Sequence, residues 1–152
     1  MTDDEFLENL DDEFFQTQFP KLAKQLGIVY TPEEVVDFIL HSVDDVLKKE
    51  FGRGLTDEGV RIIDPFTGTG KFISRLFESG LIKPEDLVRK YMDEIRAYEI
   101  VPIACKAAAH NIKKSFYDQH PVGIPDDVEF PCIRLVDTFQ MYEDGEPDFK
   151  GP

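Results

Sequence analysis

An apolar run, a glycine-rich turn and a helical pattern follow one another near the middle of the chain, and this order narrows the range of folds. The apolar run covers residues 60–63, the turn lies within Asp64–Phe72, and apolar residues recur at helical spacing beyond it. Gly68 and Gly70 allow the backbone to turn with positive φ and to approach a ligand closely. The next helix would present free N–H groups and the positive end of its dipole. The sequence therefore predicts a strand, a ligand-binding loop and a helix.

Two common nucleotide-binding patterns fit this loop poorly. A P-loop needs G-x-x-x-x-G-K-(S/T), but Pro65 stands at the first glycine and Phe72 at the residue that would hold magnesium. A dinucleotide fingerprint needs G-x-G-x-x-G, and Ile73 occupies its third glycine position. The pattern that fits is D-P-x-x-G-T-G-x-F, which resembles motif I of the S-adenosyl-L-methionine-dependent DNA methyltransferases that modify amino groups. The alternative is an ordinary strand, turn and helix with incidental glycines.

The composition limits the class of protein. The 152 residues suffice for one domain with a core, and 41% of them are hydrophobic. No apolar run approaches the roughly 18 residues of a membrane span, and no secretory signal is present. The two cysteines and three histidines are scattered, so we predict no metal site and expect a reducing, cytoplasmic setting. The net charge of −14 argues against this segment alone gripping DNA, which needs clustered lysines and arginines.

Helical patterns dominate the N-terminal third. Residues 1–26 indicate an acidic helical segment, broken at Pro20, with an apolar stripe for packing or for a partner. Thr31 is a suitable N-cap and Pro32 suits the first helical position of a helix that Gly52 would end.

Strands and helices then alternate, which predicts a parallel α/β sheet. We expect strands at 60–63, 95–99 and 132–136, and helices from the glycine loop to about 79, from 84 and over 102–115. We assign residues 1–52 to an N-terminal helical segment, 53–142 to a partial Rossmann-like core of about three strands, and 143–152 to a loose tail. Right-handed crossovers place the three strand ends at one edge, where open α/β sheets bind ligands.

An acidic residue stands at the end of each expected strand: Asp64, Glu99 and Asp137. Glu99 can accept both ribose hydroxyls of S-adenosyl-L-methionine, and Asp137 can accept the adenine amine. Asp64 can order the glycine loop and meet the methionine ammonium. Each residue alone is as readily a solvated loop carboxylate, but three of them at one edge favour a cofactor site.

Residues beside these acids complete the expected site. Phe66, Ile100 and Phe139 would cover the adenine faces, and Tyr30 and Thr31 would close over the methionine end, with core packing as the alternative for the aromatic residues. The expected cofactor-binding residues are Tyr30, Thr31, Pro32, Asp64, Pro65, Phe66, Thr67, Gly68, Thr69, Gly70, Phe72, Glu99, Ile100, Asp137, Thr138 and Phe139.

With these pieces in order, the chain resembles the N6-adenine DNA methyltransferase domain of restriction–modification proteins, of the type I-like and fused methylase–helicase kinds. That family carries G-x-x-Y-T-P, D-P-x-x-G-T-G-x-F, a strand ending in Glu, and D-T-F. Here these motifs are Gly27–Pro32, Asp64–Phe72, Tyr98–Ile100 and Asp137–Phe139, within roughly residues 20–142. The resemblance implies a Rossmann-like methyltransferase fold, S-adenosyl-L-methionine as donor, and an adenine flipped out of DNA as acceptor.

One motif of that family has no counterpart in this chain, namely the catalytic (N/D/S)-P-P-(Y/F) after the fourth strand. Asp64–Phe66 belongs to the cofactor loop, and Asp148-Phe149 lacks the prolines. We therefore predict no catalytic residues and no methylation by the chain alone. We expect an N-terminal fragment, a truncated form or a degenerate relative of a larger adenine-specific methyltransferase, which would contact DNA through its remainder.

The lack of a fourth strand would leave residues 60–63 at a sheet edge, which is a liability for association. We therefore expect self-association or marginal stability, or restriction–modification subunits as partners. Two alternatives remain open: part of a methyltransferase for protein glutamine, RNA or a small molecule, and a non-enzymatic acidic decoy or interaction module. The Tyr30–Pro32 segment favours the DNA enzymes, and the cofactor residues Glu99 and Asp137 count against a decoy.

Overall fold

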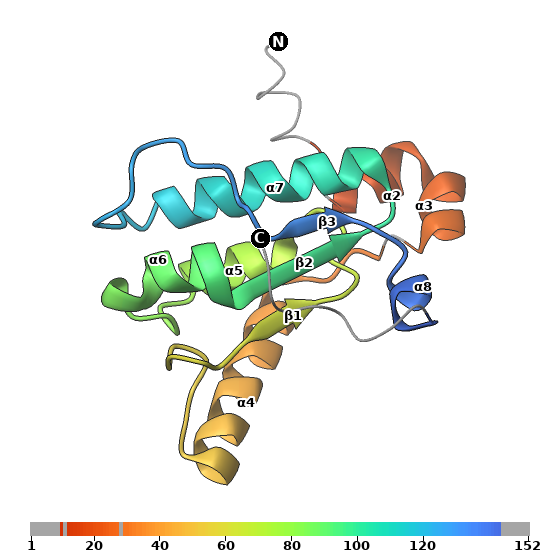
Figure 1. Ribbon diagram of the computed structural model, residues 1–152. Coiled ribbons are helices and arrows are strands. Elements are labelled where there is room, and N and C mark those ends of the chain that lie inside the picture. The colour runs from red at the N-terminus through yellow and green to blue at the C-terminus, as the bar shows by residue number, and fades with distance from the viewer. Residues whose placement is uncertain (1–9, 11, 28, 144–152) are drawn as a thin grey trace.

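The computed structural model describes residue 10, residues 12–27 and residues 29–143, and Figure 1 shows an α/β fold in which helices flank a three-stranded parallel sheet. The strands, in the spatial order β1-β2-β3, are β1 (Ile62–Asp64), β2 (Ile95–Glu99) and β3 (Ile133–Leu135). In register, Ala97 of β2 lies opposite Ile133 of β3. The predicted α/β class with three parallel strands is confirmed, and the arrangement is consistent with a partial Rossmann-like fold.

The helical segments alternate with these strands. They are α2 (Asp12–Gln18), α3 (Pro20–Leu26), α4 (Glu33–Phe51), α5 (Lys71–Glu78), η1 (Pro84–Asp86), α6 (Leu87–Arg89), η2 (Lys90–Glu94), α7 (Pro102–Tyr117) and α8 (Thr138–Glu143). Pro20 separates α2 from α3, as predicted, and residues 1–9 of the expected N-terminal helix lie outside the described part. The predicted helix from Pro84 consists of three short pieces and ends in the π-helical η2. No helix in the described ranges is long and apolar enough to cross a bilayer.

Helices α5 and α7 pack against each other beside β2 and enclose the main core. Gly70, just before α5, has a φ of 87°, and a Cβ atom there would lie 3.1 Å from the Cα of Ala108 in α7. The glycine loop therefore rests directly on α7, where any side chain at residue 70 would crowd Ala108 and hold a strained positive φ. The rings of Tyr91 and Phe116 stack within the core, with their centroids 3.9 Å apart. Other fully buried members are Ile73, Leu76, Phe77, Ile95, Ala97 and Ile112.

The start of α4 differs from the prediction. Helix α4 begins at Glu33, because Pro32 has a φ of −56° and a ψ of 146° and is not helical. No side chain caps this end, so the prediction of Thr31 as the N-cap was wrong. The other end was predicted correctly, since Gly52 ends α4 with a φ of 68°.

Other boundaries also differ: β3 covers Ile133–Leu135 rather than 132–136, and α7 continues to Tyr117 rather than ending at 115. β1 begins at Ile62 rather than at residue 60, and it includes Asp64. The D-T-F motif, expected only to end a strand, also starts α8. The reason is that the Asp137 carboxylate accepts a hydrogen bond from the Phe139 N–H at 3.0 Å, as a helix N-cap does. Most of the predicted loose tail, residues 144–152, lies outside the described part.

Helix α4 has two apolar faces, and the core covers one of them. Val36 and Leu40 are buried, whereas Phe38 is 71% exposed. The exposed apolar residues of α4 within this second face are Val35, Phe38, Ile39, Val43 and Val46. In the described part of the chain β1 has a sheet neighbour on one side only, so it forms the edge that the sequence predicted.

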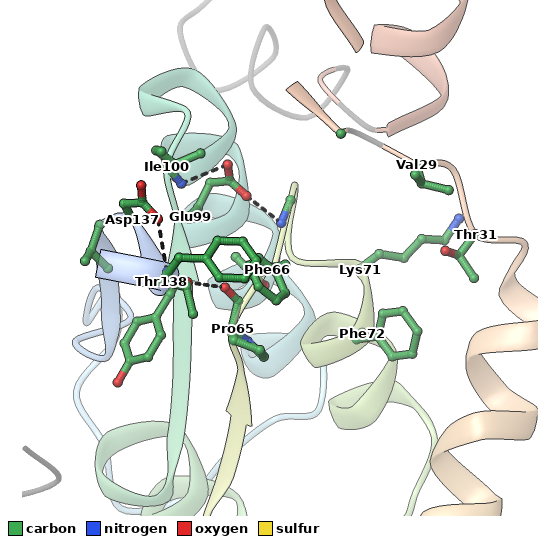
Figure 2. Close-up of a pocket in the computed structure, with 16 residues that line it drawn as sticks. Val29, Thr31, Pro65, Phe66, Lys71, Phe72, Glu99, Ile100, Asp137 and Thr138 are labelled. Carbon is green, nitrogen blue, oxygen red and sulfur yellow. Dashed lines mark hydrogen bonds between the residues drawn. The ribbon is translucent and has the colours of Figure 1, made fainter. Parts of the chain in front are cut away.

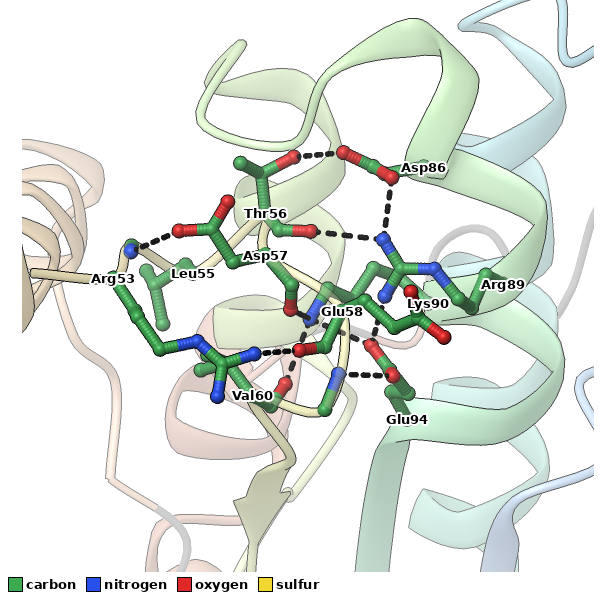
Figure 3. Close-up of polar contacts among 12 residues, drawn as sticks. Arg53, Leu55, Thr56, Asp57, Glu58, Val60, Asp86, Arg89, Lys90 and Glu94 are labelled. Atoms are coloured by element: carbon green, nitrogen blue, oxygen red, sulfur yellow. Dashed lines mark hydrogen bonds and ion pairs between the residues drawn. The ribbon is translucent and has the colours of Figure 1, made fainter.

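A polar network holds the link between α4 and β1 against η2 (Figure 3). The buried Lys90 ammonium donates hydrogen bonds to the carbonyls of Asp57 (2.9 Å) and Val60 (2.7 Å) and pairs with Glu94 at 2.8 Å. Glu94 also accepts a hydrogen bond from the Gly59 N–H at 2.6 Å. Burial lowers the pKa of Lys90. Burial alone would raise the pKa of Glu94, but its hydrogen bonds from Lys90 and Gly59 outweigh it, so that pKa lies below its ordinary value.

Candidate functional site

A pocket of about 520 Å³ lies at the carboxyl ends of the three strands (Figure 2). Four segments line it: the chain before α4, the glycine loop, and the turns that follow β2 and β3. The lining residues are Gly27, Val29, Thr31, Pro65, Phe66, Thr67, Gly68, Lys71, Phe72, Tyr98, Glu99, Ile100, Val136, Asp137, Thr138 and Phe139. This is the position at which open parallel sheets bind ligands, and the volume suits one small molecule.

The glycine loop is tied to β2 and α7 by its backbone. The Thr67 N–H donates a hydrogen bond to the Tyr98 carbonyl at 2.9 Å. The Asn111 amide of α7 donates one to the Thr69 carbonyl at 3.0 Å. Gly68 has a φ of 57°, which turns its N–H toward the end of β2. These contacts fix the shape of the loop independently of any ligand.

Glu99 ends β2 and is only 9% exposed. One of its oxygens accepts a hydrogen bond from the Gly68 N–H at 2.8 Å. The other accepts bonds from the N–H groups of Ile100 (3.0 Å) and Val101 (2.9 Å). A carboxylate has about four acceptor positions, so the oxygen that faces Gly68 keeps capacity for a further donor such as a hydroxyl. The carboxylate is thus held in a fixed orientation at the pocket.

The turn after β3 is joined to the glycine loop. The Thr138 hydroxyl donates a hydrogen bond to the Pro65 carbonyl, and Asp137 uses one oxygen to cap α8. The rings of Phe66 and Phe139 lie 5.4 Å apart at an interplanar angle of 41°. They are 62% and 74% exposed, so core packing does not explain them. Two exposed rings beside a carboxylate form a surface on which a flat heterocycle can lie.

The segment before α4 forms the opposite wall of the pocket. Figure 2 shows Val29 and Thr31 facing the start of α5, where Lys71 and Phe72 project. The Lys71 ammonium lies 4.3 Å from the centroid of the Tyr30 ring. That distance is within the range of a cation–π contact.

The structure gathers most of the predicted residues around this pocket. Those that line it are Thr31, Pro65, Phe66, Thr67, Gly68, Phe72, Glu99, Ile100, Asp137, Thr138 and Phe139. The predicted residues outside the lining are Tyr30, Pro32, Asp64, Thr69 and Gly70. Asp64 accepts a hydrogen bond from the Phe66 N–H at 3.3 Å, which matches the loop-ordering part of its expected role. Gly70 instead serves the packing of the loop on α7.

Several lining residues were not among the predicted site residues, namely Gly27, Val29, Lys71, Tyr98 and Val136. Gly27, Val29, Lys71 and Tyr98 lie within the quoted motifs but were not given a role in the site, and Val136 directly precedes the D-T-F motif. Lys71 follows Gly70 as the lysine of a P-loop does, but the rest of the P-loop pattern is lacking. Its place in the pocket depends on the segment before α4, which no local pattern links to the loop.

One polar atom in the pocket wall has a property that suits a ligand. The Thr67 hydroxyl is buried, and among the described residues it has no hydrogen-bond partner. A buried hydroxyl usually has a partner, because leaving it without one costs free energy. The wall thus offers carboxylate acceptors, a hydroxyl and flat apolar groups, which complement the hydroxyl and amine donors and the flat ring of a nucleoside.

The chain is similar to parts of solved protein–DNA complexes, two of which contain restriction–modification enzymes. No family model and no curated protein sequence matches the chain. Among solved structures, the chain is 45% identical to the ATP-dependent Type ISP restriction–modification enzyme LlaBIII bound to DNA, over 90% of this chain and 10% of that one, with a TM-score of 0.71. It is 41% identical to a nuclease-deletion mutant of the Type ISP enzyme LlaGI in complex with a DNA substrate mimic, over 94% and 12%, with a TM-score of 0.70.

A third similar structure is a cryo-EM structure of a DrdV–DNA complex, which is 36% identical over 93% of this chain and 13% of that chain, with a TM-score of 0.77. The similarity therefore includes the sequence as well as the fold. The chain spans only about a tenth of the length of each of these proteins.

Proposed function

We propose that this chain is the S-adenosyl-L-methionine-binding portion of an adenine-specific (N6) DNA methyltransferase of a restriction–modification system. The observation that carries the proposal is the pocket at the strand ends, in which Glu99 and Asp137 stand beside the glycine loop and two exposed rings. The similarity to Type ISP restriction–modification enzymes supports the restriction–modification context.

The proposed roles follow from the chemistry of each wall. Glu99 accepts one ribose hydroxyl, rather than the two that the sequence suggested, because backbone N–H groups already fill three of its about four acceptor positions. Asp137 accepts the adenine amine with the oxygen that does not cap α8. Phe66, Phe139 and Ile100, all largely exposed, flank the adenine ring. S-adenosyl-L-methionine would supply an activated methyl group on its sulfur.

The chain has no (N/D/S)-P-P-(Y/F) motif that would hold the target amine, so the proposal assigns it cofactor binding and no methyl transfer of its own. DNA is the proposed partner of the larger protein, which contacts it through parts outside these residues. Two observations support this division. The chain has a net charge of −14, and its similar structures are far longer proteins in complexes with DNA.

Self-association of the isolated chain is a further part of the proposal. The edge strand β1 and the exposed apolar face of α4 both favour it. Sedimentation velocity at several protein concentrations tests this point. A concentration-dependent sedimentation coefficient is expected, and a single monomeric species that unfolds at high temperature would contradict it.

Calorimetric titration with S-adenosyl-L-methionine tests the main proposal. We expect saturable binding that Glu99→Ala weakens by roughly 1–3 kcal/mol, the cost of removing a hydrogen bond to a charged group. Glu85→Ala is the matched control, because Glu85 is an exposed carboxylate of η1, outside the pocket. Thermal melts of each variant separate loss of binding from loss of fold. A folded chain that does not bind the cofactor, or that binds it equally well without Glu99, would overturn the proposal.

A further inference from the structure

Lys71 is the one basic residue among those that line the pocket in the described part of the chain. It is the first residue of α5, directly after the glycine loop. Figure 2 shows its side chain running toward Thr31, on the other side of the glycine loop from Glu99 and Asp137. The pocket therefore has an acidic end beside β2 and β3 and a basic end beside the segment before α4.

The Lys71 ammonium has no carboxylate partner within the described residues. Its recorded contact is with the face of the Tyr30 ring, 4.3 Å from the ring centroid. A cation–π contact of this kind orients an ammonium group without neutralising its charge. The N–H donors of Lys71 that do not face the ring can therefore bind an anion in the pocket.

A ligand must match both ends of this pocket. We propose, resting on the proposed function above, that Lys71 recognises the carboxylate of the amino-acid end of S-adenosyl-L-methionine, and that Tyr30 positions the Lys71 ammonium. With the adenosine end at Glu99 and Asp137, the amino-acid end extends past the glycine loop toward α5. Lys71 then selects ligands that carry a carboxylate over adenosine derivatives that lack one.

The test compares four ligands on the intact chain by calorimetric titration. S-adenosyl-L-methionine and S-adenosylhomocysteine carry the carboxylate. Decarboxylated S-adenosylmethionine retains the ammonium group and lacks the carboxylate, and methylthioadenosine lacks the whole amino-acid end. We expect Lys71→Met to lower the affinity for the first two ligands by roughly tenfold to a hundredfold, which is the usual effect of losing a hydrogen bond to a charged group. The affinity for the other two should not fall, and that for the doubly cationic decarboxylated ligand can rise because a like charge is removed.

Three further variants sharpen the test. Lys71→Arg should restore most of the preference for the carboxylate, because the charge is kept. Tyr30→Leu should weaken the same two carboxylate ligands by a smaller factor, whereas Tyr30→Phe, which keeps the ring, should not. Lys83→Met serves as the control, since Lys83 is an exposed lysine outside the pocket.

The outcomes separate this inference from the proposed function. If Lys71→Met weakens all four ligands equally, or none of them, while the wild-type chain binds S-adenosyl-L-methionine, the role of Lys71 is overturned and the proposed function stands. If the folded wild-type chain binds none of the four, both fail. Selective loss of the two carboxylate ligands, restored by Lys71→Arg, supports the inference.

Discussion

Charged side chains at the two ends of the sheet have different kinds of partner. At the amino end, Lys90 pairs with Glu94 in a buried network (Figure 3). At the carboxyl end, Glu99 and Asp137 accept hydrogen bonds from backbone N–H groups (Figure 2). The Lys71 ammonium lies over the ring of Tyr30. None of these three makes an ion pair within the described residues. Charges that pair with each other hold the fold, and charges held by neutral groups stay available for a ligand.

The amino-end network extends beyond its central pair. Arg89 makes ion pairs with both Asp86 and Glu94, and it donates a hydrogen bond to the Thr56 carbonyl at 3.1 Å. The Thr56 hydroxyl donates one to Asp86 at 2.7 Å. Buried ion pairs add little net stability over apolar packing, but losing one partner is costly. The network therefore serves to fix the link that enters β1 and, through β1, the glycine loop.

The largest predicted effect is the loss of one partner in this network. Glu94→Gln removes the counter-charge of the buried Lys90, and we expect the free energy of unfolding to fall by about 3 kcal/mol, the lower end of the range for a broken buried pair. Urea unfolding monitored by circular dichroism measures it. Glu85→Gln, at an exposed position, should change that free energy by less than about 0.5 kcal/mol. Equal effects of the two substitutions would contradict the structural role of the amino-end network.

A second prediction concerns the glycine loop at the carboxyl end. Gly70→Ala adds a Cβ atom 3.1 Å from the Ala108 Cα, at a residue whose φ is 87°. We expect strain and overpacking together to lower the free energy of unfolding by about 2–4 kcal/mol. Gly80→Ala is matched in φ, at 76°, but its Cβ atom meets nothing within 4 Å. Gly80→Ala should lower the free energy of unfolding only by the cost of backbone strain, about 1–2 kcal/mol. If both variants unfold at the same urea concentration, the loop does not depend on its contact with α7.

The acid dependence of stability gives a smaller and more specific effect. The pKa values of Glu94 and Asp86 in the folded chain lie below their ordinary values of 4.5 and 3.8, because hydrogen bonds and basic neighbours outweigh burial. Their contribution is therefore present above those ordinary values and is lost as the pH falls through and below them. Urea unfolding between neutral pH and about pH 3 measures it. Over this pH range, the free energy of unfolding of the wild-type chain should fall by more than that of Glu94→Gln. If the two free energies fall in parallel, Glu94 does not contribute the acid-sensitive stability.

The smallest effect concerns thiol reactivity. Burial raises the pKa of Cys132, the residue just before β3. Burial together with the nearby Glu99 raises the pKa of Cys105. Both thiols should therefore react slowly with an aromatic disulfide reagent at neutral pH, and the buried Cys132 more slowly than the half-buried Cys105. Faster labelling of Cys132 would show that β3 opens in solution.

Local patterns were enough to predict the strands and most of the pocket. Residues close in sequence determine the apolar runs, the helix end at Gly52 and the glycine loop. Glu99 and Asp137 lie at one edge because they follow neighbouring parallel strands. The features that local patterns did not predict depend on contacts between segments that are distant in sequence. The π-helical η2 arises where Lys90 and Glu94 reach the α4–β1 link, and Lys71 enters the site only beside the segment before α4.

The most direct test of the account is a crystal structure of the chain with bound S-adenosylhomocysteine. We expect a ribose hydroxyl on the Glu99 carboxylate, the adenine amine on Asp137 and the ligand carboxylate beside Lys71, with the amino-end network unchanged. A ligand bound elsewhere, or one lying in the reverse direction with its adenine beside Lys71, would contradict the assignment of the two ends of the pocket.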